Sequence, residues 1–225
     1  MAPQNEVLVA GDFSITTVIN TPPWYENCYI VHHKPSGRLL VIDPGGEATR
    51  IAAAVRALGS STPEILLTHG HPDHLGAVGE LQEIFPGGVC RAHKSEQPII
   101  DGAVQWAGAL MQRQIKPPAR LKFFDGEPEL SFGDVSVRVI FTPGHTPGGV
   151  CFVFNGFVFT GDTLFSQGVG RTDLPGGHGP TLVASITRLL EQLDDKAVLF
   201  SGHGPRWTTV DARPWWRYMV SEGYM

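Results

Sequence analysis

The stretch from His69 to His74 carries the residues of this chain that are best suited to chemistry. It reads His-Gly-His-Pro-Asp-His, so three imidazoles and one carboxylate lie almost side by side. Neutral imidazole and carboxylate are together the ligands that a zinc-like divalent ion takes. A solvent-exposed histidine-rich turn would explain one or two histidines but not this pattern. The stretch alone leaves the number of ions open, because four ligands can close one site or be divided between two.

The segments on either side of this stretch predict where it lies. The run Glu64–Leu67 before it is short and apolar, as in a buried strand, and apolar residues recur at helical spacing from Leu75 to Phe85 after it. We therefore expect the four polar side chains on a tight turn between a strand and a helix, where a rigid framework presents them.

The same pattern recurs at three further predicted strand ends. Each apolar run ends in a hydroxyl residue and then presents a histidine or an aspartate, usually after a glycine, which permits a tight turn. The four runs are Ile65–Thr68, Val139–Thr142, Val158–Thr160 and Val198–Ser201, and they precede His69, His145, Asp162 and His203. Buried strands that deliver side chains from their ends could point them into one shared cleft.

Such a cleft would gather five histidines and two aspartates: His69, His71, Asp73, His74, His145, Asp162 and His203. These ligands are too many for one tetrahedral zinc ion, and they suit two divalent ions bridged by one carboxylate, with room for a bridging water. His32 and His33 are interpreted as structural. His93 and His178 lack this setting, and we expect His178, in a glycine-rich loop, at most to approach the site.

The remaining segments alternate between predicted strands and helices, as in an α/β layered domain. Helices are expected at 47–58, 75–85, 99–115, 181–193 and 213–222. Strands are expected within 6–20 and at 28–33, 38–42, 64–67, 89–92, 130–132, 135–141, 150–154, 157–160 and 197–200. We treat residues 1–225 as one domain, in which about residues 94–128 form an insertion or a lid that borders the site.

The composition argues against several kinds of partner. With 42% hydrophobic and 17% charged residues the chain can bury a large core, and its net charge of −5 argues against nucleic acid. Cys28, Cys90 and Cys151 lie in strand-like surroundings and are expected to be buried free thiols. We find no export signal at the start and no apolar run near the about 18 residues of a membrane span, so we expect a cytoplasmic protein without a membrane partner. The oligomeric state stays open, a homodimer being one option.

The chain resembles the metallo-β-lactamase superfamily, whose signature is His-x-His-x-Asp-His followed by a separate His, Asp and His. Each element has a match here, in His69–His74, His145, Asp162 and His203, and the resemblance extends from about Asp12 to His203. It implies an α/β fold of the αβ/βα type, a four-layer sandwich of two mixed β-sheets with helices outside.

The resemblance also implies roles for these residues. His69, His71 and His145 would hold the first ion, Asp73, His74 and His203 the second, and Asp162 would bridge them. The ions would be two Zn²⁺, with Fe²⁺ as the alternative, and Asp73 would also help the nucleophilic water. Asp43, near the family's Asp-x-Gly position, would orient a ligand imidazole; a role in capping its own turn is equally consistent with the sequence.

Two segments indicate which classes within the superfamily the chain resembles. Gly161–Phe165 and Gly170–Asp173 are similar to the short glyoxalase II-like hydrolases and also to the persulfide dioxygenases, which use one iron and oxygen. Both classes act on small thiol-derived substrates of the glutathione type. Arg171 is then expected to contact the substrate, because its planar fork suits bidentate binding; a structural pair with Asp173 is the alternative.

The implied activity is hydrolysis of an acyl thioester, such as a hydroxyacylglutathione, through a metal-bridging hydroxide. An iron-dependent persulfide dioxygenase and a lactone hydrolase on the same centre are alternatives, and a non-catalytic binding module is disfavoured by the complete ligand set. The long form of glyoxalase II binds glutathione with a C-terminal helical domain, whereas this sequence ends soon after His203. Glutathione dependence is therefore left open.

Overall fold

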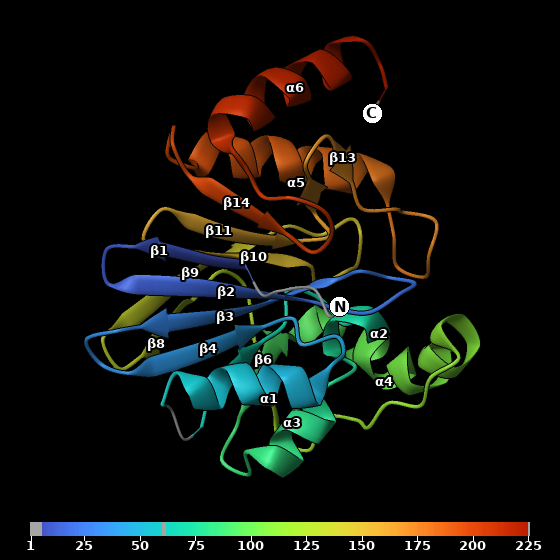
Figure 1. Cartoon of the computed structure of the whole chain (residues 1–225). Helices are drawn as coiled ribbons and strands as arrows, with labels where there is room; N and C mark the ends of the chain where they lie inside the picture. The colour runs from blue at the N-terminus through green and yellow to red at the C-terminus, as the bar shows by residue number, and fades with distance from the viewer. Residues whose placement is uncertain (1–5, 60–61, 225) are drawn as a thin grey trace.

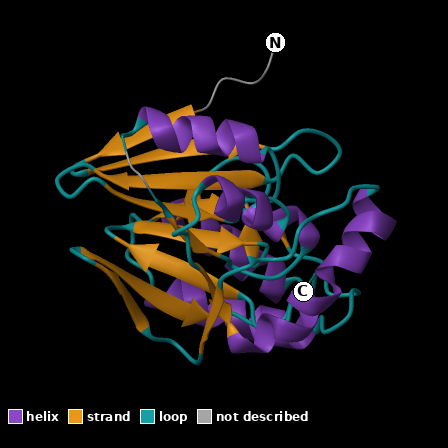
Figure 2. Ribbon diagram, turned by 90° about the horizontal axis from the view of Figure 1, so that it is seen from below, coloured by secondary structure: helices purple, strands orange, loops and turns teal. Residues whose placement is uncertain are grey.

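The central strands of this protein are apolar on both faces, so each face needs a cover. In β3 (Asn27–His33), Cys28 and Ile30 pack towards helices, whereas Tyr29 and Val31 pack towards a second sheet. The computed structural model describes residues 6–59 and 62–224. It shows two mixed sheets packed face to face with helices on both outer sides (Figures 1 and 2). The predicted αβ/βα sandwich is confirmed.

The first sheet follows the order of the chain. Its strands are β1 (Glu6–Ala10), β2 (Phe13–Ile19), β3, β4 (Arg38–Ile42), β5 (Glu64–Leu66), β6 (Cys90–His93) and β7 (Leu121–Phe124). The pairs from β1 to β4 are antiparallel, and those from β4 to β7 are parallel.

The second sheet has the order β15-β14-β11-β10-β9-β8. These strands are β15 (Trp207–Thr208), β14 (Val198–Ser201), β11 (Phe157–Gly161), β10 (Val150–Phe154), β9 (Val135–Phe141) and β8 (Glu129–Phe132), and a small hairpin of β12 (Leu164–Phe165) and β13 (Gly168–Val169) lies beside them. Phe159 and Phe200 stack in the layer between the sheets, with ring centroids 4.9 Å apart. Tyr29 of the first sheet packs edge-on against both of these rings, with centroids 5.2 and 5.3 Å away, and such aromatic contacts hold the two sheets together.

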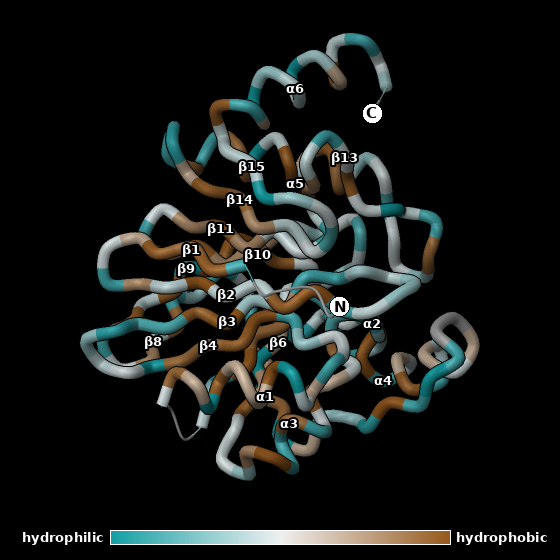
Figure 3. Tube along the Cα trace, in the orientation of Figure 1, coloured by the Kyte–Doolittle hydropathy of each residue, from teal (hydrophilic) through white to brown (hydrophobic). Residues whose placement is uncertain are grey.

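Helices cover the outer faces. α1 (Ala48–Ala57) and α3 (Val78–Ile84) cover the first sheet, and α5 (Gly179–Gln192) with α6 (Thr209–Ser221) covers the second. The hydrophobic stretches follow the strands of the two sheets (Figure 3). α2 (Pro72–Leu75) and α4 (Gln97–Trp106) lie together to one side of the sandwich (Figure 1).

The four strands expected to present ligands all end on that side. β9 and β11 both pair antiparallel with β10, and β11 pairs parallel with β14, so these three strands run in one direction. β5 of the first sheet ends opposite them, where the carbonyl of Thr68 accepts a 2.9 Å hydrogen bond from the amide of Val150. The loops that carry the candidate ligands are therefore brought together from both sheets.

Several boundaries differ from those predicted. The expected helix at 75–85 is divided into α2 and α3, because the amide of Ala77 donates to the carbonyl of Pro44 rather than continuing the helix. The helix expected at 99–115 begins at Gln97, and its end changes to a π-helical turn, η2 (Ala107–Met111). Strand β7, within the segment expected to be an insertion or lid, was not predicted.

Three expectations concern the chain as a whole. Cys28, Cys90 and Cys151 are buried free thiols, as predicted. Within the two described ranges, no helix combines the length and the apolarity that crossing a membrane requires. The start of the chain, which was read for an export signal, includes residues 1–5, and these lie outside the described residues.

Candidate metal centre

Three of the predicted ligands form a first cluster. One ring nitrogen each of His69, His71 and His145 lies within 4.8 Å of the others. Nδ1 of His71 is 2.9 Å from Nε2 of His145, and the ring centroid of His69 is 4.8 Å from that of His145. The three side chains come from the ends of β5 and β9, and all three are buried. This first cluster could supply the nitrogens of one divalent ion.

Asp73, His74 and His203 form a second cluster, whose ligand atoms also lie within 4.8 Å of one another. Oδ2 of Asp73 lies 3.4 Å from Nε2 of His203 and 3.8 Å from Nε2 of His74. His203 follows β14 of the second sheet, whereas Asp73 and His74 belong to α2, which follows β5 of the first sheet. Two imidazoles and a carboxylate here could hold a second ion.

Asp162 lies between the two clusters. Its Oδ2 is 3.6 Å from Nε2 of His145, which belongs to the first cluster. Its Oδ1 is 3.2 Å from Nε2 of His74 and 3.6 Å from Nε2 of His203, which belong to the second cluster. One carboxylate oxygen is therefore directed to each side, as a bridging ligand requires.

Unpartnered atoms at the centre of the site fit metal ions. Nε2 of His69, Nε2 of His74 and Oδ1 of Asp162 are buried, and none of them has a hydrogen-bond partner within the described part of the chain. Buried polar atoms are almost always partnered, because an unmade hydrogen bond there is costly. Coordination by a cation would satisfy these atoms and offset the burial of the carboxylates.

Outer hydrogen bonds fix the orientation of the histidines. Nδ1 of His145 donates to the carbonyl of Arg171 at 2.7 Å, and Nδ1 of His203 donates to the carbonyl of Trp24 at 2.9 Å. In each ring the other nitrogen is thereby left facing the neighbouring ligands. Bonds of this kind hold the tautomer and the direction of a ligand imidazole.

Asp43 performs the same task for His74. Its Oδ2 lies 3.1 Å from Nδ1 of His74 and accepts the hydroxyl of Thr68 at 2.6 Å, while its Oδ1 accepts the amide of Thr68 at 2.7 Å. Asp43, His69 and His74 also lie close enough together to be a metal group by spacing alone. Because both oxygens of Asp43 already accept hydrogen bonds, the geometry places Asp43 behind His74 rather than among the ligands.

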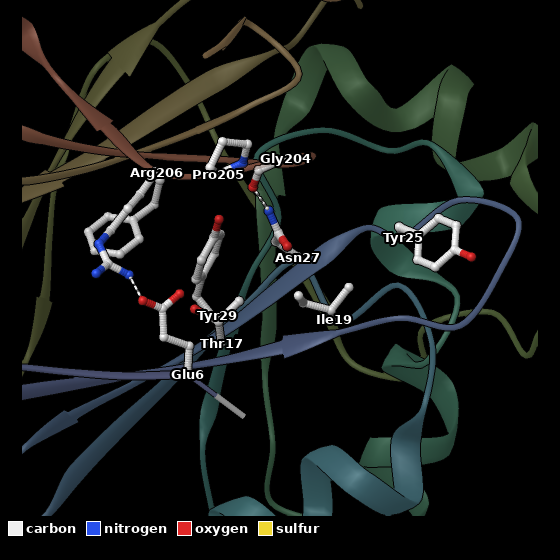
Figure 4. Close-up of a pocket in the computed structure, with 10 residues that line it drawn as sticks. Glu6, Thr17, Ile19, Tyr25, Asn27, Tyr29, Gly204, Pro205 and Arg206 are labelled. Carbon is white, nitrogen blue, oxygen red and sulfur yellow. Dashed lines mark hydrogen bonds and ion pairs between the residues drawn. The ribbon is translucent and has the colours of Figure 1, made fainter. Parts of the chain in front are cut away.

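Asn27 holds the loop that carries His203. Its side-chain amide donates to the carbonyls of Ser201 and Gly204 at 3.0 and 2.9 Å, on both sides of that histidine. Asn27 also lines a cavity of about 410 Å³ beside this loop, and the ion pair between Glu6 and Arg206 lies at the same cavity (Figure 4). The histidine clusters do not line this cavity, so we assign it no part in the chemistry.

Burial and charge divide the histidines into two groups. Burial, reinforced by the neighbouring His145, lowers the pKa of His71 to about 4, and burial also lowers the pKa of His69 well below its usual value. Burial would likewise lower the pKa of His74, but the carboxylates of Asp162 and Asp73 outweigh it and raise that pKa. The same two carboxylates raise the pKa of His203 against the effect of burial. The lowered pKa values keep His69 and His71 neutral and able to bind a cation, whereas the raised values make protons compete with a cation at His74 and His203.

The other residues singled out from the sequence lie outside these clusters. The Arg171 side chain is 60% exposed and makes a bidentate ion pair with Asp173, so only its carbonyl touches a candidate ligand. His178 accepts the amide of Thr181 at the start of α5, and His93 stacks on Phe141. His32 and His33 lie in β3. None of these four histidines enters either cluster.

Two functional candidates escaped the sequence analysis. Glu26 and Glu96 are both fully buried close to the ligand loops. Glu26 accepts a hydrogen bond from the side chain of Asn20, and Glu96 accepts backbone amides of two ligand loops. Neither lies in a sequence pattern that indicates a site, and only the packing of distant segments brings them there.

Residues 21–203 match a family described as the metallo-beta-lactamase superfamily. The chain belongs to this superfamily. The resemblance inferred from the ligand pattern is therefore confirmed, and with it metal binding and the hydrolase type of the enzyme.

This superfamily member is similar to two relatives with functional names. The protein is 36% identical over 168 residues to the probable metallo-hydrolase YqgX of Bacillus subtilis, covering 74% of this chain and 80% of that one. It is 32% identical over 196 residues to the hydroxyacylglutathione hydrolase GloC of Haemophilus influenzae, covering 86% of this chain and 92% of that one.

Two solved structures resemble this superfamily member along nearly their whole length. The BLEG-1 B3 metallo-beta-lactamase has a TM-score of 0.79 at 32% identity, with 89% of this chain and 96% of that chain covered. TTHA1623, solved in a di-iron-bound form, has a TM-score of 0.76 at 35% identity, with 88% and 96% covered. The ligand roles in this chain stay predictions, which the following variants test.

Replacing the residue between the clusters tests its role directly. Asp162→Ala should lose metal and activity together, with a fall in activity of at least about 100-fold, because both clusters lose a shared carboxylate. Metal content is measured by elemental analysis, with Asp134→Ala in an exposed turn as the control. A fully metallated and active Asp162→Ala variant would disprove the bridging role.

Acidification should remove the two ions in a fixed order. Protons compete for His74 and His203 as the pH falls through their raised pKa values, whereas His71 accepts a proton only near its pKa of about 4. Dialysis over a range from about pH 8 to about pH 4 should therefore remove the second ion before the first. Metal content after dialysis across this range is the measurement; simultaneous loss of both ions would contradict this order.

Proposed function

We propose that this enzyme hydrolyses an acyl thioester of the hydroxyacylglutathione kind with the help of two divalent ions, most simply Zn²⁺. The observation that carries the proposal is the position of Asp162 between two three-residue clusters. His69, His71 and His145 would hold the first ion, Asp73, His74 and His203 the second, and Asp162 both. The similarity to the Haemophilus GloC hydrolase supports the thioester as substrate.

The proposed reaction adds water to the carbonyl carbon of the thioester and breaks the bond from that carbon to sulfur. The products are a carboxylic acid and a thiol. When bound, a pair of divalent ions lowers the pKa of a shared water to about 7 and polarises the carbonyl, so hydroxide is supplied at neutral pH. The thioester bond would then be cleaved without a nucleophilic side chain.

Side chains and carbonyls of the chain would orient the ligand imidazoles, and Asp73 would help the attacking water. Asp43 and the carbonyls of Trp24 and Arg171 hold three of the imidazoles in fixed directions. The side chain of Asp73 is 17% exposed, so it keeps access to solvent, which fits the proposed help to the attacking water. A preorganised site of this kind needs little rearrangement at the moment of reaction.

One aromatic side chain lies near each cluster and would suit an organic substrate. The ring of Trp106 lies 6.3 Å from that of His71, and the ring of Phe165 lies 5.8 Å from that of His203. Trp106 ends α4, in the segment expected to act as a lid, and a lid role for residues 94–128 remains part of the proposal. Aromatic walls favour the apolar part of an acyl or thiol group.

One observation favours a second candidate function. TTHA1623 shares 35% of its sequence with this chain, and its structure is a di-iron-bound form. The di-iron form supports iron as an alternative metal for this ligand set, and the dioxygenase alternative would use a single iron to oxidise a persulfide with O₂. Metal identity and oxygen consumption distinguish this reaction from hydrolysis.

Metal and substrate should therefore be determined on the same preparation. We expect two equivalents of zinc per chain, because both clusters carry a complete ligand set. We also expect this protein to release thiol from a hydroxyacyl thioester. Persulfide with an oxygen electrode, a lactone and a β-lactam serve as comparison substrates. One equivalent of iron together with oxygen uptake on persulfide would replace the hydrolase assignment by the dioxygenase.

Arg171 is the proposed contact for a substrate carboxylate. Arg171→Gln should raise KM by about 10-fold for a thioester that carries a carboxylate, since a charge-assisted hydrogen bond is lost. Metal content should not change, because the carbonyl that accepts from His145 is retained. Asp173→Asn, which frees the guanidinium, should leave KM equal or lower it; an unchanged KM in Arg171→Gln would mean that the ion pair is only structural.

A further inference from the structure

Glu96 is a fully buried carboxylate that belongs to neither metal cluster. It ends η1 (Lys94–Glu96), the short 3₁₀ turn before α4, and its side chain is 0% exposed. No lysine or arginine in the described ranges forms an ion pair with it. A charge buried in this way is costly unless hydrogen bonds replace the lost water.

Both oxygens of Glu96 are used by the loops of the first cluster. Oε2 accepts the amide of Gly70 at 2.6 Å, and Oε1 accepts the amide of Gly148 at 2.6 Å. Gly70 lies between His69 and His71 after β5, and Gly148 lies in the loop of His145 after β9. One carboxylate thus joins the two loops, from two different sheets, that carry the three histidines.

The packing around the carboxylate leaves no space for side chains at these two positions. A Cβ at Gly148 would lie 2.6 Å from the backbone nitrogen of Glu96 and 2.8 Å from its Cγ. A Cβ at Gly70 would lie 2.7 Å from Cγ1 of Ile100 and 3.1 Å from Oε2 of Glu96. Glycine at both positions is what permits the backbone to approach Glu96 this closely.

The second cluster is held by other groups. His74 is oriented by Asp43, and His203 by the carbonyl of Trp24. Glu26, the other fully buried carboxylate of this region, accepts from Asn20 and pairs by its backbone with His203. The two buried glutamates therefore lie on the sides of different clusters.

We propose that Glu96 is a positioning residue for the first metal ion, setting the spacing between the His69-Gly70-His71 turn and the His145 loop. A zinc ion needs its nitrogens at about 2.0–2.1 Å, so a small separation of the two loops weakens all three bonds. Glu96 acts on the main chain rather than on a ligand ring. The inference rests on the assignment of His69, His71 and His145 to one ion.

Glu96→Gln tests this role with little change in shape. The amide nitrogen would face one of the two backbone N–H groups, so one bridge between the loops is lost. We expect the affinity for the first ion to fall by at least about 10-fold, the lower end of the effect of partners behind metal ligands. The affinity for the second ion should change by less than about 3-fold, a small part of that effect.

The two affinities are measured by titrating metal-free protein with Zn²⁺ against a chromophoric chelator. A His203→Ala background removes a second-cluster ligand and leaves the first ion to be measured alone. Glu26→Gln is the matched control, because it removes an equally buried carboxylate on the other side, and it should leave the first affinity unchanged. Thermal unfolding of each metal-free protein reports on stability separately.

The proposal would be overturned if Glu96→Gln weakened both ions equally, or if Glu26→Gln weakened the first ion as much as Glu96→Gln does. It would also be overturned if Glu96→Gln lowered stability but left the affinity for the first ion unchanged. If Glu96→Gln does not fold, Gly148→Ala keeps the carboxylate but separates the loop from it, and it should weaken the first ion selectively. The two-ion function would be refuted if the wild-type protein bound only one ion and the His203→Ala variant still bound it. The role of Glu96 at that one ion would still be testable.

Discussion

The structure depends on keeping imidazoles and carboxylates buried together, with their ligand atoms facing one another. Burial without an ion is unfavourable, because Nε2 of His69, Nε2 of His74 and Oδ1 of Asp162 have no partner among the described residues. The fold maintains this arrangement by drawing the ligands from the ends of strands that are themselves fixed in a packed core. Asp162 is central, since its two oxygens face the two clusters.

The packing of the sandwich fixes the positions of the ligand loops, and the outer hydrogen bonds fix the directions of single side chains. The edge-on contacts of Tyr29 in the first sheet with Phe159 and Phe200 in the second fix the two sheets relative to each other, and so fix where the loops begin. Asp43 and the carbonyls of Trp24 and Arg171 then set the direction of individual rings. Glu96 acts on whole loops, because it joins a loop from each sheet through hydrogen bonds to their backbone amides.

Sequence reasoning predicted the elements whose signal is local. The apolar runs before His69, His145, Asp162 and His203 indicated four strand ends, and β5, β9, β11 and β14 end at or just before those positions. The predicted sandwich followed from the resemblance that the ligand pattern carried. These signals are strong because both faces of the central strands are buried and the ligand types are specific.

Features that depend on distant partners were not predictable. The break between α2 and α3 arises because the amide of Ala77 donates to the carbonyl of Pro44, which no local pattern reveals. Strand β7 was missed because it is only four residues long, and neither of its faces is fully buried. Glu96 could not be assigned because its partners, Gly70 and Gly148, come together only in the folded chain.

The central claim is that the two clusters hold two ions joined by Asp162. Anomalous X-ray diffraction from crystals of the metal-loaded protein tests it most directly, because it locates each ion and identifies the element. The account predicts two peaks: one coordinated by His69, His71 and His145, the other by Asp73, His74 and His203, with an Asp162 oxygen bound to each. A single peak, or coordination by Asp43 in place of Asp162, would contradict it.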